Sequence, residues 1–258
     1  MIALSAATAA TVHAVAEYGG IAVGAWLYRR ALRAGAARNQ AAPSGLLARG
    51  HFAVVVGLLL GAALGNKAVF LVERPDVLAR LWQGEWLMPG QSIVGGLLGG
   101  LVGVELAKWL TAQTRSTGDA LVAPLVVGIC IGRIGCFLAG LHDDTYGLPT
   151  TLPWGVDLGG GVPRHPSPLY EIAFLLAFGA WLWRQRGRLA AVPGLQFKCF
   201  LSAYLLWRLF GDGLKPVRQP YALGLSGIQW VCIVALALYL PLVWRAARRL
   251  PIAAAATA

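Results

Sequence analysis

Long apolar segments recur along the whole chain, and this pattern constrains the fold more than any other feature of the sequence. About seven segments approach the length that a helix needs to cross the hydrocarbon core of a bilayer. They lie near residues 10–28, 52–72, 92–112, 120–140, 168–184, 197–212 and 226–245. Only 13% of the 258 residues are charged, about half the share in a typical soluble domain. The sequence therefore predicts an all-α, polytopic membrane helix bundle of about seven transmembrane helices, with 1–258 forming a single integral membrane domain.

The loops between these segments differ in charge. Basic residues without acidic neighbours fill the first loop, the loop after the fifth segment and the C-terminal tail: Arg29, Arg30, Arg33, Arg38, Arg49, Arg184, Arg186, Arg188, Lys198, Arg245, Arg248 and Arg249. By the positive-inside rule, this pattern predicts an external N-terminus and a cytoplasmic C-terminus, which an odd number of spans allows. The rule also accounts for the formal net charge of +11, so we expect no nucleic-acid partner. The first residues lack a basic region before the apolar segment, so no cleaved signal peptide is expected.

Two groups of small residues lie within the apolar segments. Gly95, Gly99 and Gly103 recur at four-residue spacing, which allows close helix approach in lipid, although glycine also admits a ligand head group. The four cysteines show neither paired metal spacing nor a secreted disulfide pattern, so we expect free buried thiols. They are Cys130, Cys136, Cys199 and Cys232.

The segment 141–167 is a long loop with an unusual composition. It contains "DDTYGLPT", "LPWGVD", "LGGGV" and "PRHPSPLYE", in which glycine and proline favour turns. Non-helical backbone at membrane depth is tolerated only against protein or a wet cavity. We therefore predict that this outer-side loop region lies over a cavity that opens on the outer side.

Charged residues inside the apolar segments need an explanation, because an arginine at mid-bilayer costs about 2.5–3.5 kcal/mol or more. Arg133 lies in the fourth segment with no acidic neighbour in sequence, so snorkelling, a buried ion pair and a binding site all remain open. Arg208 and Asp212 share one helix face at i and i+4.

Four further charged side chains lie in or next to the apolar segments. Glu105 and Lys108, spaced i and i+3, are expected to pair with each other. Arg164 lies in the stiff "PRHPSPLYE" loop, just before Glu171 opens the next span. Guanidinium groups suit bidentate contacts to phosphate. Arginines converging on an outer cavity would therefore bind the head group of a phospholipid.

Several motifs, in order and spacing, resemble the prolipoprotein diacylglyceryl transferase family over most of the chain. They are "GRIGCFLAG", "YGLPT", "LPWGVD", "PRHPSPLYE" and "GLSGIQ", with "AEYGG" and "WRLFGD" as weaker matches. The resemblance implies a seven-span enzyme of the bacterial inner membrane, which moves diacylglycerol from phosphatidylglycerol onto the lipobox cysteine thiol of a prolipoprotein and releases glycerol phosphate. Its expected partners are phosphatidylglycerol, the prolipoprotein signal peptide and membrane lipids. Neither a metal nor an organic cofactor is expected.

The resemblance also implies a set of site residues in this sequence. The expected catalytic residues are Arg133, Arg208, His165 and Tyr18. The expected substrate-binding residues are Arg133, Arg164, Cys136, Gly147, Glu171, Asp212, Gly95 and Gly96.

This sequence departs from the family pattern at four places. Val94 stands where the family has a histidine regarded as a candidate base, Cys136 where many members have asparagine, and Asp212 where glutamate is usual. The family's "NGExxG" stretch is replaced by "AGLHDDTYG". There His142, Asp143 or Asp144 either replaces the acid–base group or is a solvated loop residue.

Two other functions remain open on the sequence alone. A divergent family member would use another acceptor or lipid donor. An anion transporter or channel would also carry charges in its spans. A transporter predicts an internal repeat of spans, and "GRIGCF" and "RHPSPLYE" each occur only once.

Overall fold

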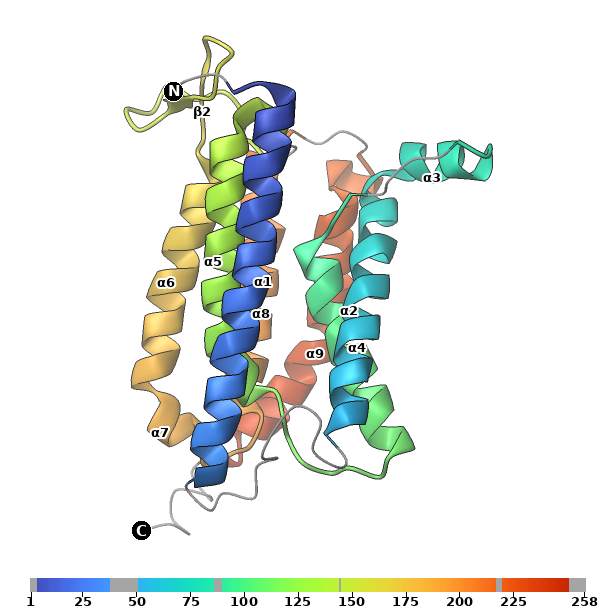
Figure 1. The fold of residues 1–258 in the computed structure, drawn as a ribbon, viewed down its shortest axis with the longest axis vertical. Helices are drawn as coiled ribbons and strands as arrows, with labels where there is room; N and C mark the ends of the chain where they lie inside the picture. Colours follow the sequence, from blue (N-terminus) through green and yellow to red (C-terminus); the bar gives the residue numbers. More distant parts are fainter. Residues whose placement is uncertain (1–3, 38–50, 86–89, 144, 217–219, 251–258) are drawn as a thin grey trace.

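The structure is a computed structural model that describes residues 4–37, 51–85, 90–143, 145–216 and 220–250. Within these residues, seven long helices run up and down side by side (Figure 1). They are α1 (Ala6–Ala37), α2 (Phe52–Glu73), α4 (Ile93–Leu110), α5 (Val122–Ala139), α6 (Ser167–Arg184), α8 (Leu195–Gly211) and α9 (Gly227–Ala247). Each coincides with one of the seven apolar segments, so the prediction of an all-α membrane bundle is confirmed.

Short elements connect the long helices. The helical ones are α3 (Pro75–Trp82), α7 (Arg186–Leu189), η1 (Asp119–Leu121), η2 (Gly140–His142), η3 (Asp212–Leu214) and η4 (Ala222–Gly224). Strands β1 (Val156–Asp157) and β2 (Pro163–Arg164) pair antiparallel in the predicted loop region. A helix satisfies its own backbone hydrogen bonds, and this requirement explains why the elements at membrane depth are helices. Four of them meet the length and hydropathy expected of a span, namely α2, α4, α5 with its flanking turns, and α9.

The helices form two groups that meet through α8 and α9. One group packs α1 against α5 and α5 against α6, and the other packs α2 against α4 (Figure 1). The apolar core lies where α4, α5, α6, α8 and α9 converge, and Leu201, Leu205 and Cys232 are completely buried there. Cys130 and Cys136 are buried as well, whereas Cys199 is only half-buried. All four thiols are free, as expected.

Glycines explain the close contact between α2 and α4. A side chain on Gly95, Gly99 or Gly103 would collide with the backbone of Gly65, Gly61 or Gly57, respectively. The four-residue spacing therefore serves helix packing, as one of the two sequence interpretations predicts.

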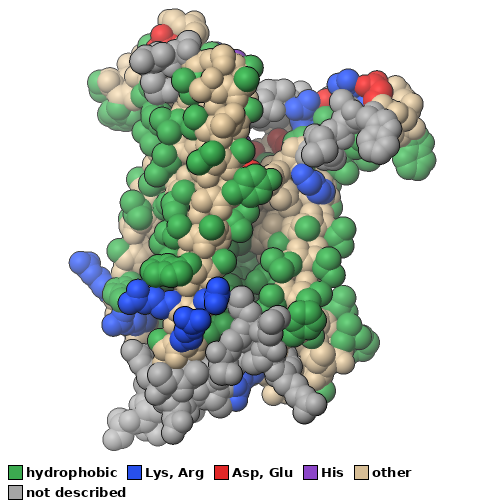
Figure 2. Space-filling model, viewed as in Figure 1, with side chains coloured by type: hydrophobic (Ala, Val, Ile, Leu, Met, Phe, Trp, Pro, Cys, Tyr) green, Lys and Arg blue, Asp and Glu red, His purple; other side chains and the backbone are tan. Residues whose placement is uncertain are grey.

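The loop region covers one end of the bundle (Figure 1). Leu148 N–H donates to the Leu214 carbonyl at 2.8 Å, and the Leu148 carbonyl accepts from His165 N–H at 3.0 Å. Asp157 accepts backbone N–H groups of Gly159, Gly160 and Gly161, which lowers the pKa of its carboxyl group. Basic side chains gather at the opposite end, where α1 ends (Figure 2).

The glycine contact between α2 and α4 can be tested within one helix. We expect Gly99→Ala to destabilise the protein by about 1–3 kcal/mol, because the added methyl group overpacks against Gly61. Gly96→Ala is the matched control, since its nearest neighbour, the Ala62 carbonyl oxygen, would lie 3.9 Å away. Thermal unfolding in detergent compares the two, and equal melting temperatures would refute the packing role.

Candidate active site

A cavity of about 480 Å³ lies between the two helix groups, beneath the loop region. Residues from α1, α2, α5, α8 and α9 line it, together with the turns that follow η2 and η3. In the space-filling view, the molecule is hollowed between α1 on one side and α2 and α4 on the other (Figure 2). The cavity is thus a meeting point for segments that are far apart in sequence.

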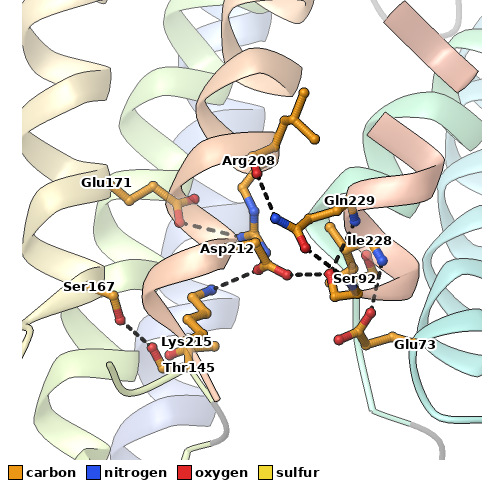
Figure 3. A network of polar contacts seen from close by, with 12 residues as sticks. Glu73, Ser92, Thr145, Ser167, Glu171, Arg208, Asp212, Lys215, Ile228 and Gln229 are labelled. Atoms are coloured by element: carbon orange, nitrogen blue, oxygen red, sulfur yellow. Dashed lines mark hydrogen bonds and ion pairs between the residues drawn. The ribbon is translucent and has the colours of Figure 1, made fainter. Parts of the chain in front are cut away.

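A chain of buried ion pairs crosses the inner wall of this cavity. Arg133 Nε lies 2.9 Å from Glu171 Oε1, and Arg208 Nη1 lies 3.4 Å from Glu171 Oε2. Arg208 Nη2 donates to Asp212 Oδ1 at 2.9 Å (Figure 3). The N–H of Arg133 Nε forms no hydrogen bond to a described residue, so its contact with Glu171 is an ion pair without hydrogen-bond geometry.

Polar side chains from α8, from the N-cap of α9 and from the residue after η3 contact these ion pairs. Tyr204 hydroxyl donates to Glu171 Oε1 at 2.6 Å, and Ser226 hydroxyl donates to Asp212 Oδ2 at 2.7 Å. Ser226 also caps the N-terminus of α9 by accepting from Gln229 N–H. Lys215 Nζ lies 3.7 Å from Asp212 Oδ1 (Figure 3). The two carboxylates are therefore held from several sides, as buried charges require.

The ion-pair network places three cations next to one another. Arg133, Arg208 and Lys215 face the carboxylates of Glu171 and Asp212. The cavity lining also includes Glu17, Glu73, Arg74 and Asp143. Both arginines and Lys215 line the cavity. Because guanidinium groups present several donors, Arg133 and Arg208 can contact an anion while they remain paired with a carboxylate.

A second cluster lies on the same cavity, next to Arg133. Cys136 Sγ is 3.6 Å from Arg133 Nη1 and 4.0 Å from His13 Nε2. His13 Nδ1 is 4.0 Å from Asp143 Oδ2, which also accepts the Thr145 hydroxyl at 2.9 Å. A thiol, an imidazole and a carboxylate thus converge from α1, α5 and the turn after η2.

The structure brings together part of the predicted site. Arg133, Arg208, Cys136 and Asp212 line the cavity, and Glu171 lies directly behind the two arginines. Arg208 and Asp212 form the pair that their i, i+4 spacing predicts. Glu105 and Lys108 pair at 2.9 Å, also as expected.

Other predicted residues lie in the loop region above the cavity. Arg164 Nη1 donates to the Gly147 carbonyl at 3.3 Å, and its guanidinium lies 5.2 Å from the Tyr146 ring centre. His165 Nδ1 is 3.2 Å from the Tyr170 hydroxyl. Gly147 packs against the backbone of His165, where a side chain would collide. None of Arg164, His165 and Gly147 is among the residues that line the 480 Å³ cavity.

Most of the remaining predicted residues lie away from this cavity. Tyr18 is 69% exposed on α1 and does not line this cavity. Gly95 is used in the contact with α2, and Gly96 lines a separate cavity of about 300 Å³. Val94, at the position of the family's histidine, is 1% exposed in the apolar core. His142, by contrast, lines the 480 Å³ cavity, and its Nε2 lies 3.0 Å from the Leu4 carbonyl oxygen. Asp144 lies outside the described residues.

Sequence reasoning missed several residues of the cavity and its wall, among them His13, Lys215 and Tyr204. His13 is a polar residue inside an apolar helix, a signal that could have identified it. Lys215 follows closely after a predicted span. Tyr204 carried no such signal, because tyrosine is common in apolar helices and only its 2.6 Å contact with Glu171 reveals its role.

The central carboxylate should be essential for stability. We expect Glu171→Gln to cost about 3–5 kcal/mol, because it leaves two buried arginines with one fewer counter-charge. Glu105→Gln is the matched control, since Glu105 is exposed and its pair with Lys108 should contribute at most about 1 kcal/mol. Thermal unfolding in detergent measures both variants. Similar losses for the two would contradict the structural role of Glu171.

Comparison with known proteins gives consistent results. The family model described as prolipoprotein diacylglyceryl transferase matches residues 2–245. A relative from Polynucleobacter necessarius subsp. necessarius (strain STIR1) is 33% identical over 202 residues, which cover 70% of each chain. Relatives from Nitratidesulfovibrio vulgaris (strain DSM 19637 / Miyazaki F) and Idiomarina loihiensis are each 34% identical, and the matches cover 78% and 81% of this chain and 73% and 77% of theirs. All three are named phosphatidylglycerol–prolipoprotein diacylglyceryl transferase.

The family model spans nearly the whole chain. The motifs that suggested the resemblance supply Arg133, Cys136, Glu171, Arg208 and Asp212, which meet at one cavity. The chain belongs to the prolipoprotein diacylglyceryl transferase family.

Proposed function

We propose that this protein transfers the diacylglyceryl group of phosphatidylglycerol to the lipobox cysteine thiol of a bacterial prolipoprotein and releases glycerol phosphate. The observation that carries the proposal is the pair of buried arginines, Arg133 and Arg208, that share one carboxylate and line one cavity. Burying two arginines in a membrane protein is costly, and such residues usually mark a functional site.

The phosphate of the lipid would lie against Arg133, Arg208 and Lys215. Glu171 and Asp212 act as positioning residues, because they hold the two guanidinium groups in place. Tyr204 and Ser226 fix the two carboxylates in turn. The donors are therefore oriented before the substrate arrives, which is the condition for strong electrostatic stabilisation.

The reaction requires that the two substrates are oriented toward each other and that the charge of the leaving phosphate is stabilised. The sulfur of the acceptor thiolate attacks the glycerol carbon that bears the phosphate ester, and the carbon–oxygen bond to phosphate breaks. The phosphate oxygen takes the electron pair and leaves, while the arginines stabilise its developing negative charge. Binding both substrates in one cavity makes the attack effectively intramolecular.

The hollow between α1 and the pair α2 and α4 supports lipid access. It lies on a lateral side of the bundle, between the helices (Figure 2). A phosphatidylglycerol molecule could therefore place its head group in the cavity while its chains remain in the membrane. The loop region would cover the outer end of the cavity. Arg164, Gly147 and His165, which belong to this loop region, would contact the acceptor peptide or hold the loop region in place.

We infer an orientation in the bacterial inner membrane, with the beginning of α1 outside and the end of α9 in the cytoplasm. The basic side chains of α1, α7 and the end of α9 lie at one end of the bundle, away from the cavity (Figures 1 and 2). Positive charge is retained on the cytoplasmic side. The cavity then faces the outer leaflet.

The phosphate role of Arg133 can be tested in a transfer assay. Purified protein in detergent receives phosphatidylglycerol and a lipobox peptide, and mass spectrometry detects a diacylglyceryl group on the cysteine. We expect Arg133→Ala to lower turnover by a factor of about 10²–10³ or more, as removal of an oxyanion donor does. Arg133→Lys should retain part of the activity, since it keeps the charge but loses the planar donor geometry.

Arg80→Ala is the control, because Arg80 is an exposed residue of α3 that pairs with Glu85. It should leave turnover unchanged. Near-normal turnover of folded Arg133→Ala would overturn the phosphate site, and a wild-type protein that moves anions without alkylating the peptide would favour a transporter.

The binding of the lipid phosphate should depend on pH through Lys215. Burial, with Arg208 and Arg133 nearby, lowers the pKa of Lys215 to about 8. Its ammonium is therefore charged below about pH 8 and neutral above it. We expect the affinity for phosphatidylglycerol to fall about tenfold or more as pH rises through this value, because one charge-assisted contact is lost.

Lys215→Arg separates this effect from other titrations, since arginine stays charged throughout the same pH range. Its affinity for phosphatidylglycerol in detergent should remain nearly constant there. A wild-type profile that matches that of Lys215→Arg would exclude Lys215 as the titrating group.

A further inference from the structure

A histidine and a carboxylate meet beside the phosphate site. His13 Nδ1 lies 4.0 Å from Asp143 Oδ2, and His13 Nε2 lies 4.0 Å from Cys136 Sγ. The two ring nitrogens of His13 therefore face different groups. His13 belongs to α1, Cys136 to the last turn of α5 and Asp143 follows η2, so only the fold brings them together. All three residues line the 480 Å³ cavity.

The packing of α1 against α5 fixes the position of His13. A side chain on Gly135 of α5 would collide with Ala16 and would come within 3.4 Å of the Cα atom of His13. The helices can therefore approach closely at this point only because residue 135 is glycine. The His13 side chain is nevertheless 36% exposed, so the imidazole remains accessible from the cavity.

The Asp143 carboxylate is held in place by its own contacts. Asp143 Oδ2 accepts the Thr145 hydroxyl at 2.9 Å, and the Thr145 carbonyl accepts the hydroxyl of Ser167, the first residue of α6 (Figure 3). A carboxylate beside Nδ1 favours the tautomer of His13 that carries its proton on that nitrogen. Nε2 then holds the free electron pair and can accept a proton.

The elements packed against His13 carry other titratable or charged side chains at the cavity. They are Glu17 on α1, Arg133 and Cys136 on α5, and His142 in η2. The Nε2 atom of His142 lies 3.0 Å from the Leu4 carbonyl oxygen. Imidazole is the side chain best suited to take up and release a proton near neutral pH. His142 is therefore the second histidine that a test must distinguish from His13.

We propose that His13 is the general base that removes the proton from the acceptor cysteine thiol, with Asp143 as its positioning residue. The inference rests on the proposed function for the identity of the acceptor. It assigns a base to a chain in which Val94, at the position of the family's histidine, is 1% exposed in the apolar core. The long contact between Nε2 and Cys136 leaves Nε2 available, because catalytic hydrogen bonds often tighten only when the substrate binds.

Cys136 connects the proposed base with the phosphate site. Its Sγ lies 4.0 Å from His13 Nε2 and 3.6 Å from Arg133 Nη1. The base and one of the proposed phosphate donors are therefore neighbours of the same sulfur atom. An acceptor thiol that contacts His13 from the cavity would consequently lie close to the lipid phosphate that Arg133 binds.

The proton and the electron pairs would move as follows. The proton of the acceptor thiol passes to His13 Nε2, and the resulting imidazolium is stabilised by the carboxylate of Asp143. The sulfur electron pair forms the bond to the glycerol carbon, while the carbon–oxygen bond to phosphate breaks and its electron pair stays on the phosphate oxygen. His13 then gives its proton to the released phosphate or to water, which restores the neutral imidazole.

The base can be removed in the transfer assay with His13→Gln. We expect the turnover of a cysteine peptide at pH 7 to fall by a factor of about 10²–10⁴, the usual contribution of a general base. This loss should become smaller as the pH rises above about 8.5, where a free thiol ionises without help. Each rate is divided by the wild-type rate at the same pH, which removes the effect of Lys215 on lipid binding.

A lipobox peptide with selenocysteine in place of cysteine separates proton transfer from a structural role. A selenol is already ionised at neutral pH, so its alkylation needs no base. We expect His13→Gln to alkylate this peptide at nearly the wild-type rate. Asp143→Asn should behave in the same way, slow with the cysteine peptide and nearly normal with the selenocysteine peptide. A purely structural role of either residue would slow both peptides equally.

His51→Gln is the matched control. His51 contacts the Tyr28 hydroxyl at 3.1 Å and is not among the described residues that line the cavity. This variant should retain the wild-type turnover with both peptides. Thermal unfolding in detergent verifies that each variant is folded, and Asp143→Asn tests the pair if His13→Gln fails to fold.

The outcomes separate the base from the proposed function. Wild-type turnover of the cysteine peptide by folded His13→Gln would overturn the assignment, and so would an equal loss with both peptides. A selective loss in His142→Gln in place of His13→Gln would assign the base to the other histidine. A wild-type protein that alkylates neither peptide would instead contradict the proposed function itself.

Discussion

The ion pairs around Glu171 are the interaction on which the rest of the structure depends. Two arginines and a glutamate without counter-charges would be prohibitively expensive inside a membrane bundle. Glu171 of α6 satisfies Arg133 of α5 and Arg208 of α8 at the same time, and so ties three helices together at one level. Asp212, Ser226 and the cap of α9 extend this connection to a fourth helix.

The two helix groups contribute differently to the ion pairs and to the cavity. The glycine contact between α2 and α4 makes a compact pair that carries no charge of the ion-pair chain. The group of α1, α5 and α6 supplies Arg133, Glu171, His13 and Cys136. Separation of the groups leaves the hollow in which a lipid head group can meet a thiol (Figure 2).

Arg133 links the two polar clusters of the cavity. Its Nε lies 2.9 Å from Glu171 Oε1, and its Nη1 lies 3.6 Å from Cys136 Sγ. A guanidinium can contact both clusters because its donors point in several directions within one plane.

The sequence by itself determined the helices, because apolar length and local spacing are properties of contiguous residues. The seven segments, the Arg208–Asp212 and Glu105–Lys108 pairs and the glycine stripe could all be predicted in this way. Only the tertiary structure decided which distant side chains meet. The sharing of Glu171 by two arginines, the burial of Val94 and the convergence of His13 with Cys136 depend on how helices rotate and pack, and no spacing along the chain specifies this.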